Sequence, residues 1–207
     1  MPAIPLLHFA VDGSCLRNPG GPSGWAWVCS DGRYSLGYTK SATSQIAELW
    51  GVITCLRDNP TGRLVIQSDS AYVVQIVNGW AAGWEKRGWT TASGTPVQNL
   101  ALVKTLMRLL RNRPEGHTAQ IVKVPGHDKE GRWPLNTVAD QLAQRASKMA
   151  RIENRDGEEA GQRKPFTGPL EPGAVVTGTR GDAPGQRCGS CEAIIRPAPP
   201  YCRCDIN

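Results

Sequence analysis

The sequence predicts a mixed α/β layer fold over residues 1–150, with a five-stranded sheet flanked by helices. Three observations lead to this prediction. Strand-like apolar segments fill the N-terminal part, segments of helical period alternate with strand-like ones after it, and Asp31-Gly32 separates two strand-like segments as a hairpin turn. A hairpin-extended sheet followed by interleaved helices is a mixed α/β arrangement.

The first three strands are expected over residues 6–11, 24–29 and 33–38. The first is a short apolar run that ends at Asp12, and a turn rich in Gly and Pro separates it from the second. Because Asp31-Gly32 is a strong signal for a tight hairpin, the second and third strands should pair antiparallel. We expect the first three strands of the sheet to form one antiparallel unit.

Helical segments follow this hairpin unit. Apolar residues recur at helical spacing between Ile46 and Leu56, where Thr43 or Ser44 can cap the N-terminus. A fourth strand is expected over 64–67, and a short helix that begins after Ser70 should stop at Asn78-Gly79. The remaining expected elements are a helix from Asn99 with one apolar and one basic side, a fifth strand over 119–124 and a last helix from Asn136.

The composition changes near residue 150. The segment 151–207 contains eight Gly and seven Pro among its 57 residues, which is typical of a linker. We therefore predict a folded domain over 1–150, a flexible linker over 151–186 and a small element over 187–207.

Four cysteines crowd the end of the sequence in a CxxC and a CxC pair. Four thiolates at this spacing fit a tetrahedral Zn²⁺ site, which can stabilise a short segment that has no core. A thiol tail without metal, disordered or redox-active, is the alternative. The four residues are Cys188, Cys191, Cys202 and Cys204.

The charge balance favours a polyanionic partner. The 207 residues include 24 Lys and Arg against 18 Asp and Glu, a formal net charge of +6. No run of 18 apolar residues occurs, and Asp12 interrupts the N-terminal apolar stretch that a secretory signal would need. We expect a cytoplasmic protein without a membrane span, and nothing in the sequence demands more than a monomer.

Four carboxylates are placed where they can converge. Asp12 and Asp69 each follow an apolar strand, while Glu48 and Asp140 each stand two residues past an apolar helical position, about 200° around the helix axis. Taken singly, each is an ordinary cap or turn residue. Together at one sheet edge they would repel one another, and hard divalent cations such as Mg²⁺ would relieve that repulsion.

The sequence contains five blocks in a set order, namely DGSCLRNPG at 12–20, AEL at 47–49, QSDS at 67–70, VPGH at 124–127 and NTVAD at 136–140. In this order they resemble ribonuclease HI, the type 1 ribonuclease H family. The resemblance runs from about residue 7 to residue 149 and implies a ribonuclease H-like fold. It further implies endonucleolytic cleavage of the RNA strand of RNA/DNA hybrids, giving 5′-phosphate and 3′-hydroxyl ends, for primer removal and R-loop clearance.

The same resemblance assigns catalytic roles. Asp12 would bridge two Mg²⁺ ions, Asp140 would complete the first site, and Glu48 with Asp69 would hold the second ion, with Mn²⁺ as an alternative metal. One ion would activate water while the other stabilises the leaving oxygen. His127 would assist proton transfer or product departure, and its alternative is an ordinary loop histidine.

Contacts to the hybrid are implied as well. Minor-groove contacts would come from Asn18, Ser44, Gln45 and the backbone of Cys15, although Asn18 can also serve a turn and Ser44 a helix cap. A basic handle over about 80–98 would grip the DNA strand, with Trp84 and Trp89 packing inside it. The handle and phosphate contacts would come from Trp80, Lys86, Arg87, Thr43 and Asn99.

Two other function classes are compatible with such a fold. One is a nucleic-acid-binding module that does not cut, which would need degraded metal carboxylates. The other is a polynucleotidyl transferase of the same superfamily, such as a transposase or resolvase, which the handle and the His127 loop disfavour.

Overall fold

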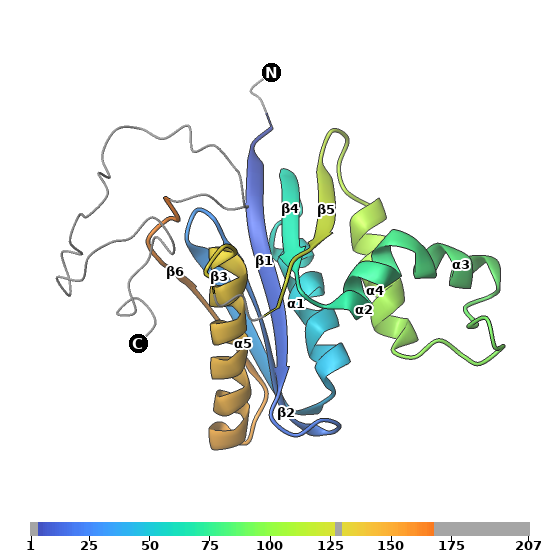
Figure 1. Ribbon diagram of the computed structural model, residues 1–207, viewed down its shortest axis with the longest axis horizontal. Helices are drawn as coiled ribbons and strands as arrows, with labels where there is room; N and C mark the ends of the chain where they lie inside the picture. Colours follow the sequence, from blue (N-terminus) through green and yellow to red (C-terminus); the bar gives the residue numbers. More distant parts are fainter. Residues whose placement is uncertain (1–3, 127–129, 168–207) are drawn as a thin grey trace.

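The computed structural model describes residues 4–126 and 130–167 (Figure 1). His127 and the four C-terminal cysteines therefore lie outside the described residues. A six-stranded sheet in the order β5-β4-β1-β2-β3-β6 forms the centre. The elements are β1 (Leu6–Cys15), β2 (Gly21–Cys29), β3 (Arg33–Ala42), α1 (Ser44–Asp58), β4 (Arg63–Ser68), α2 (Ala71–Gln75), the π-helix η1 (Ile76–Trp80), α3 (Ala81–Lys86), α4 (Leu100–Arg111), β5 (Thr118–Lys123), α5 (Pro134–Glu153) and β6 (Gly157–Gln162).

The predicted antiparallel unit is confirmed. β1 pairs with β2 and β2 with β3 in antiparallel register, while β4 runs parallel to β1 and β5 parallel to β4. Gly32 occupies the hairpin turn with a positive φ of 91°, a conformation that glycine adopts without strain.

The prediction of five strands is wrong, because β6 adds a sixth on the free edge of β3. This strand lies inside the segment that composition marked as a linker. Its sequence, GEEAGQ, has no apolar alternation, so the strand is held at the sheet edge by backbone pairing with β3. Gly157 and Gly161 lie directly beside the hydroxyl ends of Tyr38 and Tyr34, so small residues are required there.

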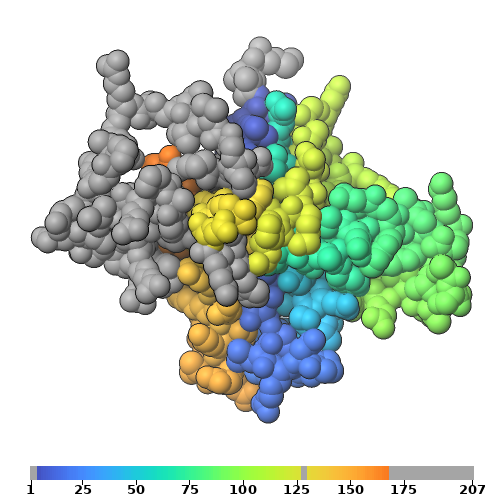
Figure 2. Space-filling view, viewed as in Figure 1, coloured from blue at the N-terminus to red at the C-terminus, as the bar shows by residue number. Residues whose placement is uncertain are grey.

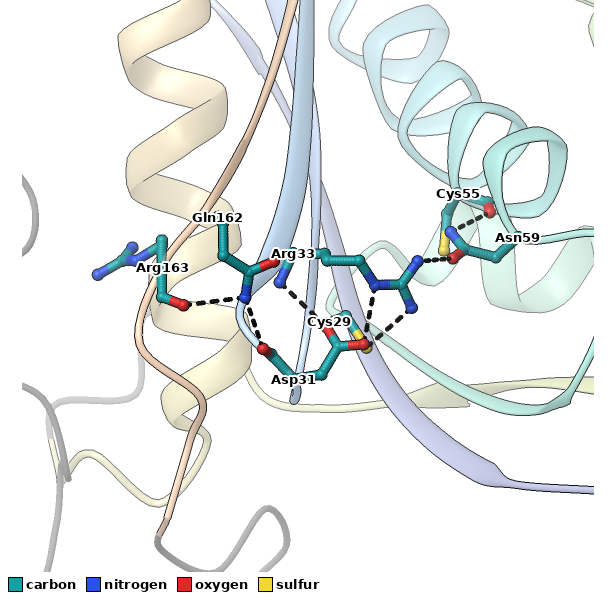
Figure 3. Close-up of polar contacts among 7 residues, drawn as sticks. All are labelled: Cys29, Asp31, Arg33, Cys55, Asn59, Gln162 and Arg163. Atoms are coloured by element: carbon teal, nitrogen blue, oxygen red, sulfur yellow. Dashed lines mark hydrogen bonds and ion pairs between the residues drawn. The ribbon is translucent and has the colours of Figure 1, made fainter.

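Polar contacts fasten β6 and the hairpin turn to the end of α1 (Figure 3). The Arg33 guanidinium donates through Nε to Asp31 at 2.8 Å and through a terminal nitrogen to the Asn59 side chain at 2.9 Å. Gln162 Nε2 donates to the Asp31 backbone carbonyl at 2.8 Å. These bonds lie at the end of the sheet where β2 ends and β3 begins.

The sheet has an apolar core on each face. Phe9 and Val11 of β1 point into a core with α1 and α4, whereas Ala10 between them points into a second core with α5. This alternation is the two-residue period of a strand buried on both faces. Accordingly, α1 and α5 lie on opposite faces of the sheet (Figure 1).

The predicted stop of the short helix at Asn78-Gly79 is wrong. Ser70 caps α2 as expected, accepting from the Val73 N–H at 3.4 Å, but the chain remains helical through η1 and α3 to Lys86. Ile76, Ala81 and Trp84 are buried, and this burial offsets the cost of about 1 kcal/mol that a helical glycine carries.

Within the described ranges, no helix is both long enough and apolar enough to cross a membrane.

Candidate active site

Strand pairing brings Asp12 and Asp69 together. Val11 of β1 lies opposite Ser68 of β4 in the parallel register, so the next residue of each strand reaches the same edge of the sheet. β4 ends at Ser68, whereas β1 continues to Cys15 because β2 still pairs with it. Asp12 therefore lies within a strand rather than at its end, and it is 6% exposed.

Gly13 allows Glu48 to approach this edge. A Cβ on Gly13 would come within 2.5 Å of the Ala47 carbonyl carbon and 2.8 Å of the Glu48 Cα. The backbone of α1 thus packs directly on the backbone of β1. This close approach requires glycine and delivers the Glu48 carboxylate to the side of Asp12.

One ligand oxygen each from Asp12, Glu48 and Asp69 lie within 4.8 Å of one another. Asp140 of α5 is outside this triad, although its charge raises the pKa of both Asp12 and Glu48. Its Oδ1 accepts a hydrogen bond from Gln144 Nε2 at 2.8 Å. Three of the four predicted carboxylates therefore form one compact group, and the fourth acts on it at longer range.

Burial and mutual repulsion perturb the triad. Burial raises the pKa of Asp12 well above its ordinary value, and the charges of Glu48, Asp69 and Asp140 raise it further. Burial, together with the charges of Asp69 and Asp140, raises the pKa of Glu48 to about 8, and the charge of Lys123 opposes this rise. The group is poised to accept positive charge.

The donor set fits a hard divalent cation. It offers carboxylate oxygens only, and Glu48 Oε2 is buried without a hydrogen-bond partner. A buried carboxylate oxygen normally has a donor or a metal opposite it. The arrangement is therefore suited to Mg²⁺ or a similar oxygen-seeking ion.

The loop after β5 packs against Asp69. A Cβ on Gly126 would lie 2.7 Å from Asp69 Oδ2, so only glycine leaves the carboxylate in its place. His127 is the next residue in the sequence. Although it lies outside the described residues, its neighbour in the chain lies against the triad.

The predicted hybrid contacts gather at the N-terminus of α1. Asn18 Oδ1 accepts from the Ser44 N–H at 3.1 Å, and Thr43 Oγ1 accepts from the Ile46 N–H at 3.2 Å. Cys15 Sγ lies 3.5 Å from the Ala42 carbonyl oxygen, and Gln45 is exposed. Of the two caps that the sequence allowed, Thr43 and Ser44, the structure uses Thr43, and all five residues adjoin the helix that carries Glu48.

The segment predicted as a handle forms a lobe beside the sheet, coloured green in Figure 2. Trp80 is 43% exposed and packs edge-on against Tyr72, with ring centroids 6.4 Å apart. Asn99 Nδ2 donates to the Tyr72 hydroxyl at 3.3 Å. Tyr72 therefore connects two of the predicted contact residues.

Other handle residues divide into an outer and an inner set. Lys86 and Arg87 are exposed. Trp84 is buried, and Trp89 lies under the Lys104 ammonium at 5.1 Å from its ring centroid, so both tryptophans pack as predicted. Glu85 forms a two-bond ion pair with Arg111 at 2.6 and 3.0 Å, which fastens α3 to α4.

Sequence reasoning missed Gly13, Lys123 and Tyr72 as parts of this site. Gly13 follows Asp12 directly, and a glycine inside a strand is a known sign of close backbone approach. Lys123 is the last residue of β5. Its positive charge acts on Glu48 only because the fold brings the two residues together, and the sequence does not show this proximity. Tyr72 gave no signal beyond its place on a helix.

Comparisons with known proteins identify related chains. Residues 6–148 match the family model described as RNase H. The chain is 36% identical over 162 residues to ribonuclease HI of Streptomyces coelicolor, covering 75% of this chain and 66% of the relative. It is 39% identical over 148 residues to ribonuclease H of Anaeromyxobacter dehalogenans, covering 66% of this chain and 77% of the relative.

Solved structures share the fold. A crystal structure of a type 1 RNase H with the type 2 active-site motif superposes with a TM-score of 0.59 at 26% identity, over 70% of this chain and 74% of the other. A foamy viral protease-reverse transcriptase in complex with RNA/DNA hybrid superposes with a TM-score of 0.54 at 22% identity, over 68% of this chain and 20% of the other. The second likeness concerns the fold alone.

Proposed function

The chain belongs to the RNase H family of ribonuclease H hydrolases, and from this premise we propose that it cuts the RNA strand of RNA/DNA hybrids internally. The products would carry 5′-phosphate and 3′-hydroxyl ends. The observation that carries the proposal is the triad of carboxylates within 4.8 Å, of which Glu48 lies on the same helix as the candidate hybrid contacts. Primer removal and R-loop clearance are the cellular tasks that such cleavage serves.

The proposed metals are two Mg²⁺ ions, with Mn²⁺ as the alternative. Asp12 would be shared between them, Asp140 would complete one site, and Glu48 with Asp69 would hold the other. When bound, ions at such a site lower the pKa of an attacking water and neutralise charge on the leaving oxygen. The partnerless Glu48 Oε2 and the raised pKa of Glu48 support this assignment.

The protein's own residues position the reacting groups. Asp12 is held inside the β1 ladder, and the Gly13 contact fixes the backbone of Glu48, so the backbone positions of both residues are set before anything binds. Lys123 offsets part of the negative charge of Glu48. His127, adjacent to the Gly126 contact on Asp69, would assist proton transfer or product departure from its imidazole.

Hybrid recognition would combine two surfaces. Asn18, Ser44 and Gln45 would read the 2′-hydroxyl groups of the RNA strand in the minor groove, with the Cys15 backbone beside them. On the handle, Trp80 would stack on a deoxyribose, while Thr43 and Asn99 would bind a phosphate of the DNA strand. The exposed side chains of Lys86 and Arg87 add electrostatic attraction to the phosphate backbone.

A separate proposal concerns the cysteine tail. We propose that one Zn²⁺ binds the thiolates of Cys188, Cys191, Cys202 and Cys204. Metal analysis of the purified full chain should find one zinc per chain, lost when Cys188 and Cys191 are both replaced by Ser. Zinc-free protein that keeps four titratable thiols at this end would contradict the proposal.

Cleavage of labelled duplexes tests the proposed activity. The purified full chain should cut the RNA strand of an RNA/DNA hybrid in Mg²⁺, leaving RNA/RNA and DNA/DNA duplexes intact, and EDTA should abolish the reaction. Analysis of the ends should find 5′-phosphate and 3′-hydroxyl. Binding without cutting would favour a binding module, and cutting of DNA duplexes would favour a different polynucleotidyl transferase. The cytoplasmic location and the monomeric state stay predictions.

A further inference from the structure

An aromatic groove lies on the α1 face of the sheet, and none of its lining residues belongs to the carboxylate triad. Its volume is about 570 Å³, within the usual range of about 300–1,000 Å³ for ligand sites. Its lining includes Trp25, Thr39, Ile46, Trp50, Asp156 and Glu158. These residues come from β2, β3, α1, β6 and the turn before β6, so the sixth strand builds one wall.

Two stacked indoles form the apolar part of the groove. The rings of Trp25 and Trp50 lie 5.7 Å apart between centroids at an interplanar angle of 24°. The Trp25 ring rests on the backbone of Gly37, where a Cβ would come within 2.5 Å of it. Trp50 is only half-buried, so part of this aromatic surface is open to a ligand.

The rim of the groove is acidic. Among the described residues that line the groove, Arg57 is the one cation. Its guanidinium pairs with Asp58 at 2.9 Å and with Glu158 at 3.6 Å. Asp156 accepts from the Lys40 N–H at 2.9 Å and the Thr39 hydroxyl at 3.0 Å, and these bonds lower its pKa. A carboxylate accepts further donors, so the rim favours a cationic ligand over a phosphate.

The sequence of this chain contains a segment of matching chemistry. Residues 196–201 read RPAPPY, an arginine followed by a PxxP pattern. Proline-rich PxxP segments bind grooves lined by aromatic residues, because the polyproline II conformation costs little entropy to fix. The aromatic and acidic lining of the groove is therefore complementary to this basic, proline-rich segment.

The connecting length permits this contact. The last described residue, Thr167, is 29 residues before Arg196, and a chain of 29 residues spans about 30 Å on root-mean-square average. Thr167 is nine residues after Glu158 of the groove, a separation of at most about 30 Å even for extended chain. The segment can reach the groove of its own chain, where tethering raises its effective concentration.

We propose that this groove binds the chain's own segment 196–201, with the Arg196 guanidinium at Asp156 and Glu158 and the prolines on the indoles of Trp25 and Trp50. Ser41 and Ala42 also line the groove, directly before Thr43. The bound segment would therefore lie beside the N-terminus of α1 and the candidate hybrid contacts.

Indole N–H signals in NMR spectra of the full chain test the proposal. A variant with Pro197, Pro199 and Pro200 replaced by Ser should shift the signals of Trp25 and Trp50, while the signals of Trp84 and Trp89 stay in place. Identical Trp25 and Trp50 signals in the two proteins would overturn the proposal.

Charge exchange provides a matched test of the rim. Arg196→Glu should shift the same two signals, as should Glu158→Arg, whose side chain is exposed enough to spare the fold. Combining the two should restore the wild-type positions, and Arg187→Glu, outside the segment, should change nothing. If the double variant does not restore the wild-type positions, the proposal is overturned. Signals that shift with protein concentration would also overturn binding within one chain, because they would indicate that the segment binds a second copy.

Discussion

The side chain of Asn18 accepts a hydrogen bond from the backbone N–H of Ser44 at 3.1 Å. This N–H belongs to the first turn of α1, where backbone donors have no partner within the helix. Thr43 Oγ1 accepts from a second donor of that turn, the Ile46 N–H, at 3.2 Å. Asn18 thus joins the loop after β1 to the helix that carries Glu48, and Thr43 caps that helix. Both residues are also candidate hybrid contacts.

Replacing Asn18 with Ala should therefore affect folding and substrate binding together. The free energy of unfolding should fall by about 1 kcal/mol, the usual net value of such a bond. The KM for an RNA/DNA hybrid should rise more than kcat falls, because the proposed contact is made in the bound state as well as in the transition state. Denaturant unfolding and steady-state kinetics measure both effects. Asn112→Ala, at the exposed end of α4, is the control, and an unchanged KM in Asn18→Ala would argue against the minor-groove role.

Gly13→Ala should separate α1 from β1. Its Cβ would overlap the backbone of Ala47 and Glu48, and overpacking of this kind costs about 1–3 kcal/mol. Because Glu48 moves with the helix, cleavage should also slow. Gly79→Ala is the matched control, since a Cβ at Gly79 meets nothing within 4 Å. Equal unfolding energies for the two variants would show that the close approach is unimportant.

Metal-free protein should lose stability as the pH rises. The pKa of Glu48 is raised from 4.5 to about 8, so the folded state holds a proton that the unfolded state has already released. Below about pH 4.5 Glu48 is protonated in both the folded and the unfolded state, and its ionisation costs no stability. As the pH rises to about 8, the free energy of unfolding falls, because the unfolded state releases this proton more readily than the folded state does. Because a tenfold difference in proton affinity corresponds to about 1.4 kcal/mol, the stability lost over this range is several kcal/mol.

Urea unfolding in EDTA between pH 5 and 9 would measure this loss. The wild type should lose stability relative to Glu48→Gln as the pH rises, because the Gln side chain does not ionise. Added Mg²⁺ should restore the stability of the wild type at high pH. Parallel pH profiles for the two proteins, with no response to Mg²⁺, would contradict the assigned burial and repulsion.

The handle should determine how hybrid affinity depends on salt. Each phosphate contact that is lost reduces the slope of log K against log salt by about 1, so replacing Lys86 and Arg87 with Gln should reduce it by about 2. Replacing exposed Arg63 at the start of β4 with Gln should leave the slope unchanged. The affinity for a labelled hybrid can be measured by fluorescence anisotropy in Ca²⁺, an ion that carboxylate oxygens also bind. An unchanged slope in the double variant would remove the handle from the binding surface.

Sequence reasoning succeeded where local chemistry and tertiary structure agree. The Asp31-Gly32 hairpin and the caps at Thr43 and Ser70 are local signals that the structure confirms. The convergence of Asp12, Glu48 and Asp69 was also accessible, because Asp12 and Asp69 each follow an apolar run in the sequence and Glu48 stands off the apolar stripe of its helix.

It failed where the decisive partner is distant in sequence. β6 carries no apolar period, and only the free edge of β3 and the hydroxyl ends of Tyr34 and Tyr38 explain why its glycines form a strand. Asn78-Gly79 reads as a stop, yet the burial of Ile76 and Trp84 holds the helix through it. Tertiary packing overrode local propensity at both places.

The most direct test of the account is the rate of hybrid cleavage by Asp69→Asn in Mg²⁺. Loss of even an indirect partner of a metal ligand typically costs about 10- to 100-fold, so loss of a carboxylate of the triad should reduce the rate at least about a hundredfold. Glu115→Gln, an exposed acid outside the triad, should cleave as the wild type does. A folded Asp69→Asn protein that cuts the RNA strand at close to the wild-type rate would contradict the assignment of the triad as the catalytic centre.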